Sequence, residues 1–204
     1  EFKKMGLELG DNGSYYQDVP LVEIKGTPSE TMEVTGGKST IQLHNSTDFV
    51  AFTRQESEQI DLKNSPLVFA GYGVVAPEYH WNDYAGLDVK GKTVVLLVND
   101  PGFKSGDPKL FKGDTMTYYG RWTYKYEEAA RQGAAGVIIV HQTEPASYPW
   151  SVVSSSNTGA RLYLQQSNKH MDRCKVEGWM TEDAAKKIFA QAGITGDFRA
   201  MARK

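Results

Sequence analysis

The sequence of 204 residues has little of what defines several specialised classes of protein. It has one cysteine, Cys174, so no intrachain disulfide can form, and we interpret this residue as a small hydrophobe. The longest apolar runs, Val94–Val98 and Ala134–Val140, fall far short of the about 20 residues that span a bilayer. The formal net charge is −2, and no block of Lys and Arg could follow a phosphate backbone. We therefore expect neither a membrane nor a nucleic acid as partner.

Signatures of catalysis are also missing. The sequence contains no G-x-S-x-G, no H-E-x-x-H and no D-x-[DN]-x-[DN]-G calcium loop. Gly71–Ala76 fits the G-x-G-x-x-A pattern, but Pro77 follows an extended stretch, so no helix is expected there to receive a pyrophosphate. We interpret the adjacent Glu127 and Glu128 as residues on the outer surface of a helix. We therefore expect no catalytic residue in this chain.

Metal ligands are equally hard to find. The four histidines stand in loops or at strand ends, without a third ligand nearby in sequence, and we interpret them as solvated or singly bonded imidazoles: His44, His80, His141 and His170. Three loop aspartates could ligate calcium through oxygen, and the sequence leaves this open: Asp88, Asp100 and Asp107. We expect no zinc in this chain.

What the sequence does contain is typical of a globular domain, with 40% hydrophobic and 24% charged residues. Pro66–Val74 and Lys92–Asn99 are rich in apolar, β-branched residues and predict buried strands. Arg121–Gln132 predicts an amphipathic helix that ends before Gly133, and Ala134–His141 predicts the strand that follows. A strand–strand–helix–strand order results.

The helical spacing makes a prediction about the faces of this helix. Trp122, Tyr126 and Ala129 recur at i, i+4 and i+7, so we expect them to face the core. Glu127 and Arg131 are spaced as an outward-facing i,i+4 ion pair.

The flanking segments give shorter signals. Tyr15–Ile24 predicts one strand, and Thr31–Val34 and Thr40–His44 predict two more around a Gly-Gly turn. Ser154–Gly159 has loop composition. Thr181 is a candidate N-cap of a second helix, because two acidic residues follow it in the first turn.

Several separate phrases resemble the protease-associated (PA) domain, a non-catalytic module inserted into peptidases. The phrases Pro66–Val74, Asp88–Asp100 and Tyr126–His141 carry this resemblance. Met5–Leu21 and Glu177–Ala185 resemble the segments that flank the module in bacterial zinc aminopeptidases related to glutamate carboxypeptidase II and the transferrin receptor. Together the phrases extend over nearly the whole chain.

The resemblance implies a mixed α/β (α+β) fold, with a β-sheet or open β-barrel flanked by one or two helices. It implies three parts: a flank of the peptidase-domain rim at 1–45, the PA domain at 46–165 and a helical flank at 166–204. It also implies a zinc-dependent, exported aminopeptidase as the parent protein, in which this domain covers the active-site cleft and aids substrate selection. Zinc is then expected in the catalytic domain, and the partners are that domain and the peptide substrate.

One segment is a candidate for contact with the substrate. Met116–Tyr126 has five aromatic and two cationic residues around the expected start of the helix. Because Trp122 and Tyr126 are assigned to the core, Tyr118, Tyr119 and Arg121 are left at a loop–helix junction, where such residues often serve recognition. The alternative is that the two tyrosines only pack against the sheet and do not contact a substrate.

Two other functions remain open. A free-standing module that binds peptides or proteins would have the same fold, although it would not need flanks of the aminopeptidase kind. A small hydrolase in its own right would need a catalytic set that the sequence does not display.

Overall fold

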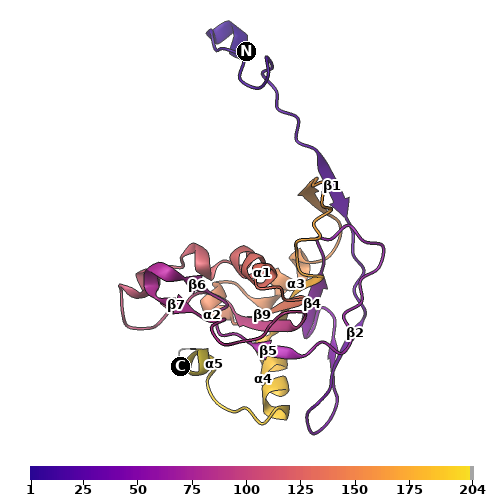
Figure 1. Ribbon diagram of the computed structural model, residues 1–204, viewed down its shortest axis with the longest axis vertical. Helices are drawn as coiled ribbons and strands as arrows, with labels where there is room; N and C mark the ends of the chain where they lie inside the picture. The colour runs from indigo at the N-terminus through magenta and orange to yellow at the C-terminus, as the bar shows by residue number, and fades with distance from the viewer. Residues whose placement is uncertain (203–204) are drawn as a thin grey trace.

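The computed structural model describes residues 1–202, and a five-stranded sheet forms its centre (Figure 1). Across the sheet, the strands are β4 (Phe49–Phe52), β11 (Val176–Thr181), β9 (Gly136–His141), β8 (Thr93–Leu97) and β5 (Leu67–Phe69). All neighbours pair in parallel except β4, which is antiparallel to β11. The mixed α/β prediction is confirmed, and no sheet within residues 1–202 closes into a barrel.

Both faces of this sheet are covered. Alternate residues of β8 point to opposite sides, so that Val94 and Leu96 belong to one buried cluster and Val95 and Leu97 to another. The first face packs against helix α1 (Trp122–Arg131) and the short helices α2 (Thr143–Ala146) and α3 (Trp150–Ser156). The second packs against α4 (Glu182–Gln191) and α5 (Phe198–Ala202). The predicted core residues of β8 and β9, together with Val98 directly after β8, are buried: Val94, Leu96, Val98, Val137 and Ile139.

Two segments differ from the sequence prediction. Val176–Thr181, where no strand was predicted, is β11 and lies between β4 and β9. An ideal Cβ at Gly178 would lie 2.5 Å from Val50 O, so the absence of a side chain at Gly178 allows the close pairing with β4. Part of the predicted Ser154–Gly159 loop is helical, because α3 continues to Ser156 and buries Val153.

Helix α4 forms as predicted. The Thr181 hydroxyl accepts a hydrogen bond from Ala184 N at 3.2 Å, which is the expected N-cap. Ala185, Ile188 and Phe189 of α4 are buried, whereas Ala192 is exposed. The helix ends at Gln191, one residue before Ala192, which explains that difference.

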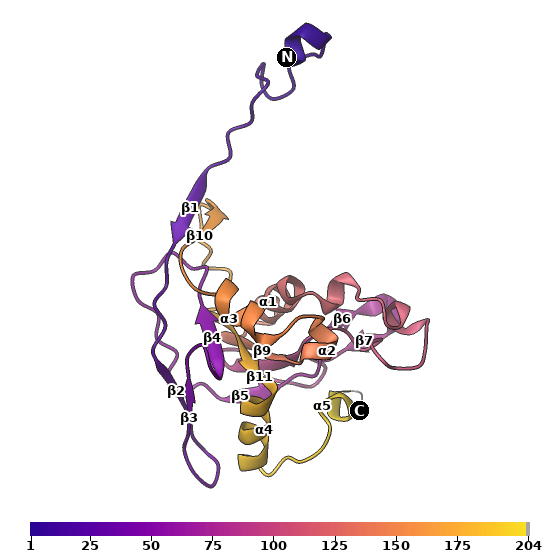
Figure 2. The ribbon, with the colours of Figure 1, turned by 180° about the vertical axis from the view of Figure 1, so that it is seen from behind.

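Three two-stranded ladders complete the fold: β2 (Thr31–Val34) with β3 (Ile41–His44), β6 (Val75–Ala76) with β7 (Trp81–Asn82), and β1 (Leu21–Ile24) with β10 (Arg161–Leu164). The predicted strand at Tyr15–Ile24 is thus shorter than expected. From β1 the N-terminal segment runs away from the body to a 3₁₀ turn, η1 (Phe2–Met5) (Figures 1 and 2). Further 3₁₀ turns are η2 (Pro77–Tyr79), η3 (Leu110–Lys112) and η4 (Tyr118–Gly120). No helix of residues 1–202 has the length and apolarity to cross a membrane.

Candidate functional site: an aromatic junction at the start of helix α1

The three predicted contact residues lie together where η4 leads into α1. Tyr118 and Tyr119 are part of η4, and Arg121 is the N-cap residue of α1. With Trp122, the first residue of the helix, they form what we call the aromatic junction.

Two features of the sequence hold this turn in place. Asp100 Oδ2 accepts hydrogen bonds from Thr117 N at 2.9 Å and from Thr117 Oγ1 at 2.6 Å, directly before η4. An ideal Cβ at Gly120 would lie 2.7 Å from Met116 Cγ and 3.1 Å from Asn99 Oδ1, so only glycine fits there without a shift.

Tyr119 is anchored on both sides. Its ring packs edge-on against Phe111 and Tyr124, with centroids 5.6 and 5.0 Å away. Its hydroxyl donates a hydrogen bond to Glu78 Oε1 at 2.7 Å. This bond raises the pKa of Tyr119 to about 12 and lowers the pKa of Glu78. Tyr119 is half-buried and therefore joins η4 to the β6–β7 ladder as well as lining the surface.

Tyr118 and Arg121 are exposed. The side chain of Tyr118 is 58% exposed, and its hydroxyl donates to Glu127 Oε2 at 3.0 Å. Burial raises the pKa of Tyr148, and the positive charge of Arg121 acts in the opposite direction. Both side chains can therefore meet a ligand at the surface, as a flat ring and a cation.

The prediction that Trp122 faces the core is wrong. Its side chain is 40% exposed, although the indole stays close to Tyr126, with ring centroids 5.9 Å apart. Tyr126 and Ala129 are buried as predicted, and Tyr124, Lys125 and Glu128 are buried beside them, so the buried face of the helix is wider than the apolar spacing indicated. The exposed indole adds a third ring to the junction.

The polar pairs of α1 also differ from the prediction. Arg131 bonds Glu128 rather than Glu127, with Nη2–Oε2 at 2.7 Å and Nε–Oε2 at 2.8 Å. Glu128 is buried and not on the outer surface as expected. Glu127 lies 3.8 Å from Arg173 Nη1 and accepts from Tyr118. Both carboxylates are thus engaged within the domain.

The remaining candidates are held by the fold. His141 Nε2 lies 3.0 Å from Tyr148 O, and His170 Nε2 lies 2.9 Å from Leu164 O. Burial lowers the pKa of His141, so a neutral ring is favoured. After Gly71 and Gly73, which have φ of +53° and +64°, come strand β6 and the 3₁₀ turn η2 rather than an α-helix. Within residues 1–202, no three His, Cys, Asp or Glu side chains are grouped closely enough to hold a metal ion.

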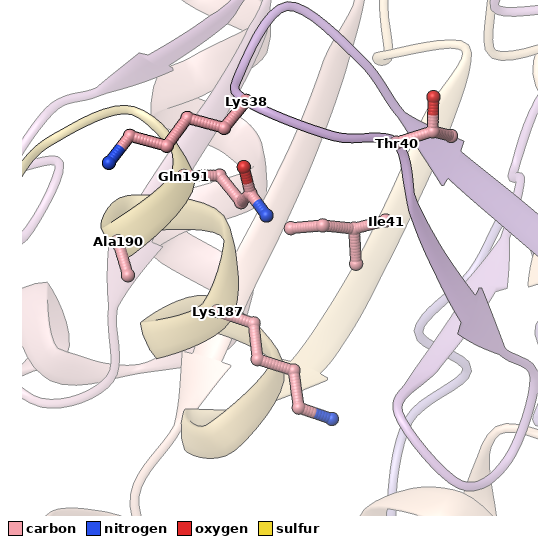
Figure 3. A pocket seen from close by; sticks show the side chains of 6 residues that line it. All are labelled: Lys38, Thr40, Ile41, Lys187, Ala190 and Gln191. Carbon is pink, nitrogen blue, oxygen red and sulfur yellow. The ribbon is translucent and has the colours of Figure 1, made fainter.

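A groove of about 480 Å³ lies elsewhere, between the β2–β3 hairpin and the end of α4 (Figure 3). It is lined by Lys38, Thr40, Ile41, Lys187, Ala190 and Gln191. Gln191 bridges to the hairpin, since its Oε1 accepts from Ser39 N at 3.1 Å and its Nε2 donates to Ser39 Oγ at 2.6 Å. We therefore interpret the groove as the exposed edge of the contact between α4 and the β2–β3 hairpin.

Besides Asp100 and Glu128, two charged residues are buried that the sequence did not indicate. Lys125 has no exposed surface, and Glu177 on β11 is buried 2.9 Å from Arg54 Nε. Desolvation raises the pKa of Glu177 to about 7 despite this cation. Neither residue had a signal in the sequence, because a charged residue in an amphipathic helix or beside a charged run is ordinarily solvated.

Comparison with known families agrees with this architecture. The PA domain family matches residues 63–170, more than half of the chain, and the chain therefore belongs to that family. An aminopeptidase from Aneurinibacillus sp. strain AM-1 is a similar solved structure, with 19% sequence identity and a TM-score of 0.39. The alignment covers 86% of this chain but 31% of the aminopeptidase. No curated protein matches by sequence.

Proposed function

We propose that this chain is the accessory, non-catalytic part of a zinc-dependent aminopeptidase. In this proposal the PA domain covers the active-site cleft and helps to select the peptide. The zinc and the catalytic residues belong to a peptidase domain of the same polypeptide, which is exported. The observation that carries the proposal is the exposed aromatic junction on a chain of the PA domain family.

The chemistry of the junction suits a peptide. Tyr118 and Trp122 offer exposed rings that can cover apolar side chains, and Arg121 offers a guanidinium that can bind a carboxylate. The rings are positioned by Tyr124 and Tyr126 below them, with centroids 5.7 and 5.9 Å away. A surface whose rings are fixed in advance loses less conformational entropy when it binds.

The N-terminal flank supports a covalently attached partner domain. Large hydrophobic side chains that are at least half exposed gather on residues 1–21 and on β10: Phe2, Met5, Leu7, Leu9, Tyr16, Val19, Leu21, Leu162 and Leu164. Exposed apolar groups in such numbers are typical of an interface. A peptidase domain joined at this end would cover them.

Peptide binding to the 204-residue chain tests the proposal. The probe is leucyl-leucyl-leucine, and its C-terminal amide serves as the comparison that lacks the carboxylate. We expect the tripeptide acid to shift the backbone N–H signals of residues 118–122. Its C-terminal amide should bind more weakly. Tyr118→Ala should weaken both ligands, whereas Arg121→Gln should weaken only the acid, because the amide has no charge to lose.

Lys187→Ala is the matched control, since it removes an exposed cation on α4. The proposal fails if the tripeptide shifts no junction signal at millimolar concentration, or if the control weakens binding as much as Arg121→Gln does. In the complete polypeptide, chelator-sensitive release of p-nitroaniline from leucine p-nitroanilide tests the peptidase part. Binding without any such activity would favour the free-standing module instead.

A further inference from the structure

Lys125 lies in the middle of α1 and is completely buried. Its ammonium donates hydrogen bonds to Tyr72 O at 2.5 Å and to Tyr119 O at 3.3 Å. It also lies 5.9 Å from the centroid of the Tyr72 ring. A buried lysine is costly unless its charge finds partners, so a residue kept in this place needs an explanation.

The two carbonyl groups belong to different parts of the fold. Tyr72 is in the tight turn between β5 and β6, and Tyr119 is in η4 and belongs to the aromatic junction. One ammonium therefore joins the junction to the edge of the central sheet. Asp100 also holds the start of η4, because it accepts two hydrogen bonds from Thr117.

The charges around Lys125 come from two further elements. Burial lowers its pKa to about 7, and Asp83, beyond β7, and Asp100, beyond β8, act in the opposite direction. Burial also raises the pKa of Asp83 to about 6, although Val74 N donates to its Oδ2 at 2.9 Å. The ammonium is thus stabilised by carboxylates and carbonyls that only the folded chain brings together.

We propose that Lys125 is a positioning residue, which holds η4 against the β5–β6 turn and thereby sets the shape of the aromatic junction. Its importance for peptide recognition rests on the proposed function, whereas its effect on the junction can be measured without any peptide. Arg121 N bonds Tyr118 O at 3.0 Å and Gly120 N bonds Thr117 O at 3.1 Å, so these two amides report whether the turn is intact.

Lys125→Met tests this, because methionine fills a similar volume without donating a hydrogen bond. We expect hydrogen exchange at the amides of Gly120 and Arg121 to become about tenfold faster, as for the loss of one charge-assisted bond. The amides of Val137 and Ile139 in the core should exchange as before. Lys125→Gln, which keeps two N–H donors, should restore much of the protection, and Lys187→Met should change nothing.

A pH titration provides the second readout. In the natural sequence the amide shifts of Gly120 and Arg121 should titrate with a midpoint near the pKa of Lys125, about 7. Asp83→Asn should move this midpoint downward, because it removes one of the carboxylates that favour the ammonium. The titration should vanish in Lys125→Met.

The proposal is overturned if exchange at Gly120 and Arg121 is the same in Lys125→Met as in the natural sequence. It is also overturned if the titration persists in that variant. Should Lys125→Met fail to fold, the Asp83→Asn titration still decides, since a midpoint that does not move would assign the titration to another group. These results do not depend on tripeptide binding, so a failure of the proposed function is seen separately.

Discussion

The residues of the aromatic junction are held to different degrees. Tyr119 has edge-on contacts with two rings and a hydrogen bond to Glu78, whereas Tyr118 and Arg121 are exposed. The packing of Tyr119 fits the interpretation in which it supports the fold. Contact of Tyr118 with a ligand stays a prediction, which its exposed ring permits.

Alanine substitution should distinguish Tyr119 from Tyr118 and Arg121. We expect Tyr119→Ala to lower the free energy of unfolding by about 2 kcal/mol, because it removes a half-buried ring and leaves Glu78 without its donor. Tyr118→Ala and Arg121→Ala should change it by less than about 0.5 kcal/mol, as is usual for exposed side chains. Urea denaturation measures all three. Equal losses for Tyr118→Ala and Tyr119→Ala would contradict this division.

The buried ammonium of Lys125 predicts a pH dependence of stability. Burial lowers its pKa from 10.5 to about 7, so above pH 7 the unfolded chain holds a proton that the folded chain has released. The cost of burying the charge is complete below pH 7 and is relieved as the pH rises toward 10.5. Relative to Lys125→Met, the natural protein should therefore gain stability between pH 7 and pH 9.5.

Melting temperatures of the two proteins at pH 7 and 9.5 check this expectation. Comparison with Lys125→Met is essential, because tyrosines and other lysines also begin to titrate at the upper pH. Parallel pH curves for the two proteins would show that the folded chain keeps its proton on Lys125.

At the scale of elements, composition and hydrophobic period in the sequence predicted two central strands and two helices. β8 and β9 have long β-branched runs, and α1 and α4 have a helical period with a glycine or an N-cap at one end. β11 has Glu177 and Gly178 within six residues and no alternation, so its place inside the sheet depends on its neighbours. Tertiary packing there overrides the local preference for a loop.

The candidate site, too, was only partly predictable from the sequence. The crowding of rings and cations around Arg121 indicated a surface, and the three candidates do lie together there. The burial of Lys125 was not predictable, because its partners Tyr72 and Asp83 are far away in sequence. A pattern of apolar residues cannot represent a buried ion.

Gly178 gives a prediction for β11. An added Cβ would lie 2.5 Å from Val50 O and 3.4 Å from Ala51 Cα, so Gly178→Ala should push β4 away from the sheet. We expect a loss of about 1–3 kcal/mol, seen as a melting temperature lower by roughly 2–10 °C. Gly26→Ala is the control, since nothing lies within 4 Å of its added Cβ. Equal melting temperatures for the two variants would contradict this expectation, because β4 would then move away without a loss of stability.

At the scale of the whole molecule, the structure has a packed body and a projecting end. The two buried clusters contain residues from β3 to α5, and none from residues 1–21. The N-terminal segment is held mainly by itself, with Tyr15 Oη donating to Leu7 O at 2.7 Å. Gln165 N donates to Pro20 O at 2.9 Å, at the point where this segment joins the β1–β10 ladder.

Removal of residues 1–19 should therefore leave the body unchanged. We expect its melting temperature to stay within about 1 °C, because the removed side chains contribute nothing to the two clusters. Self-association at high concentration, measured by sedimentation, should decrease, because six large exposed hydrophobic side chains disappear with the segment.

Removal of residues 198–204 is the matched control at the other end. Phe198 is buried, with ring centroids 4.8 Å from Phe189 and 6.4 Å from Phe69, so this version should melt several degrees lower. A large loss of stability on removal of residues 1–19 would show that the segment packs on the body in solution. Its apolar side chains would then be covered by the domain itself and would no longer indicate a partner domain at this end.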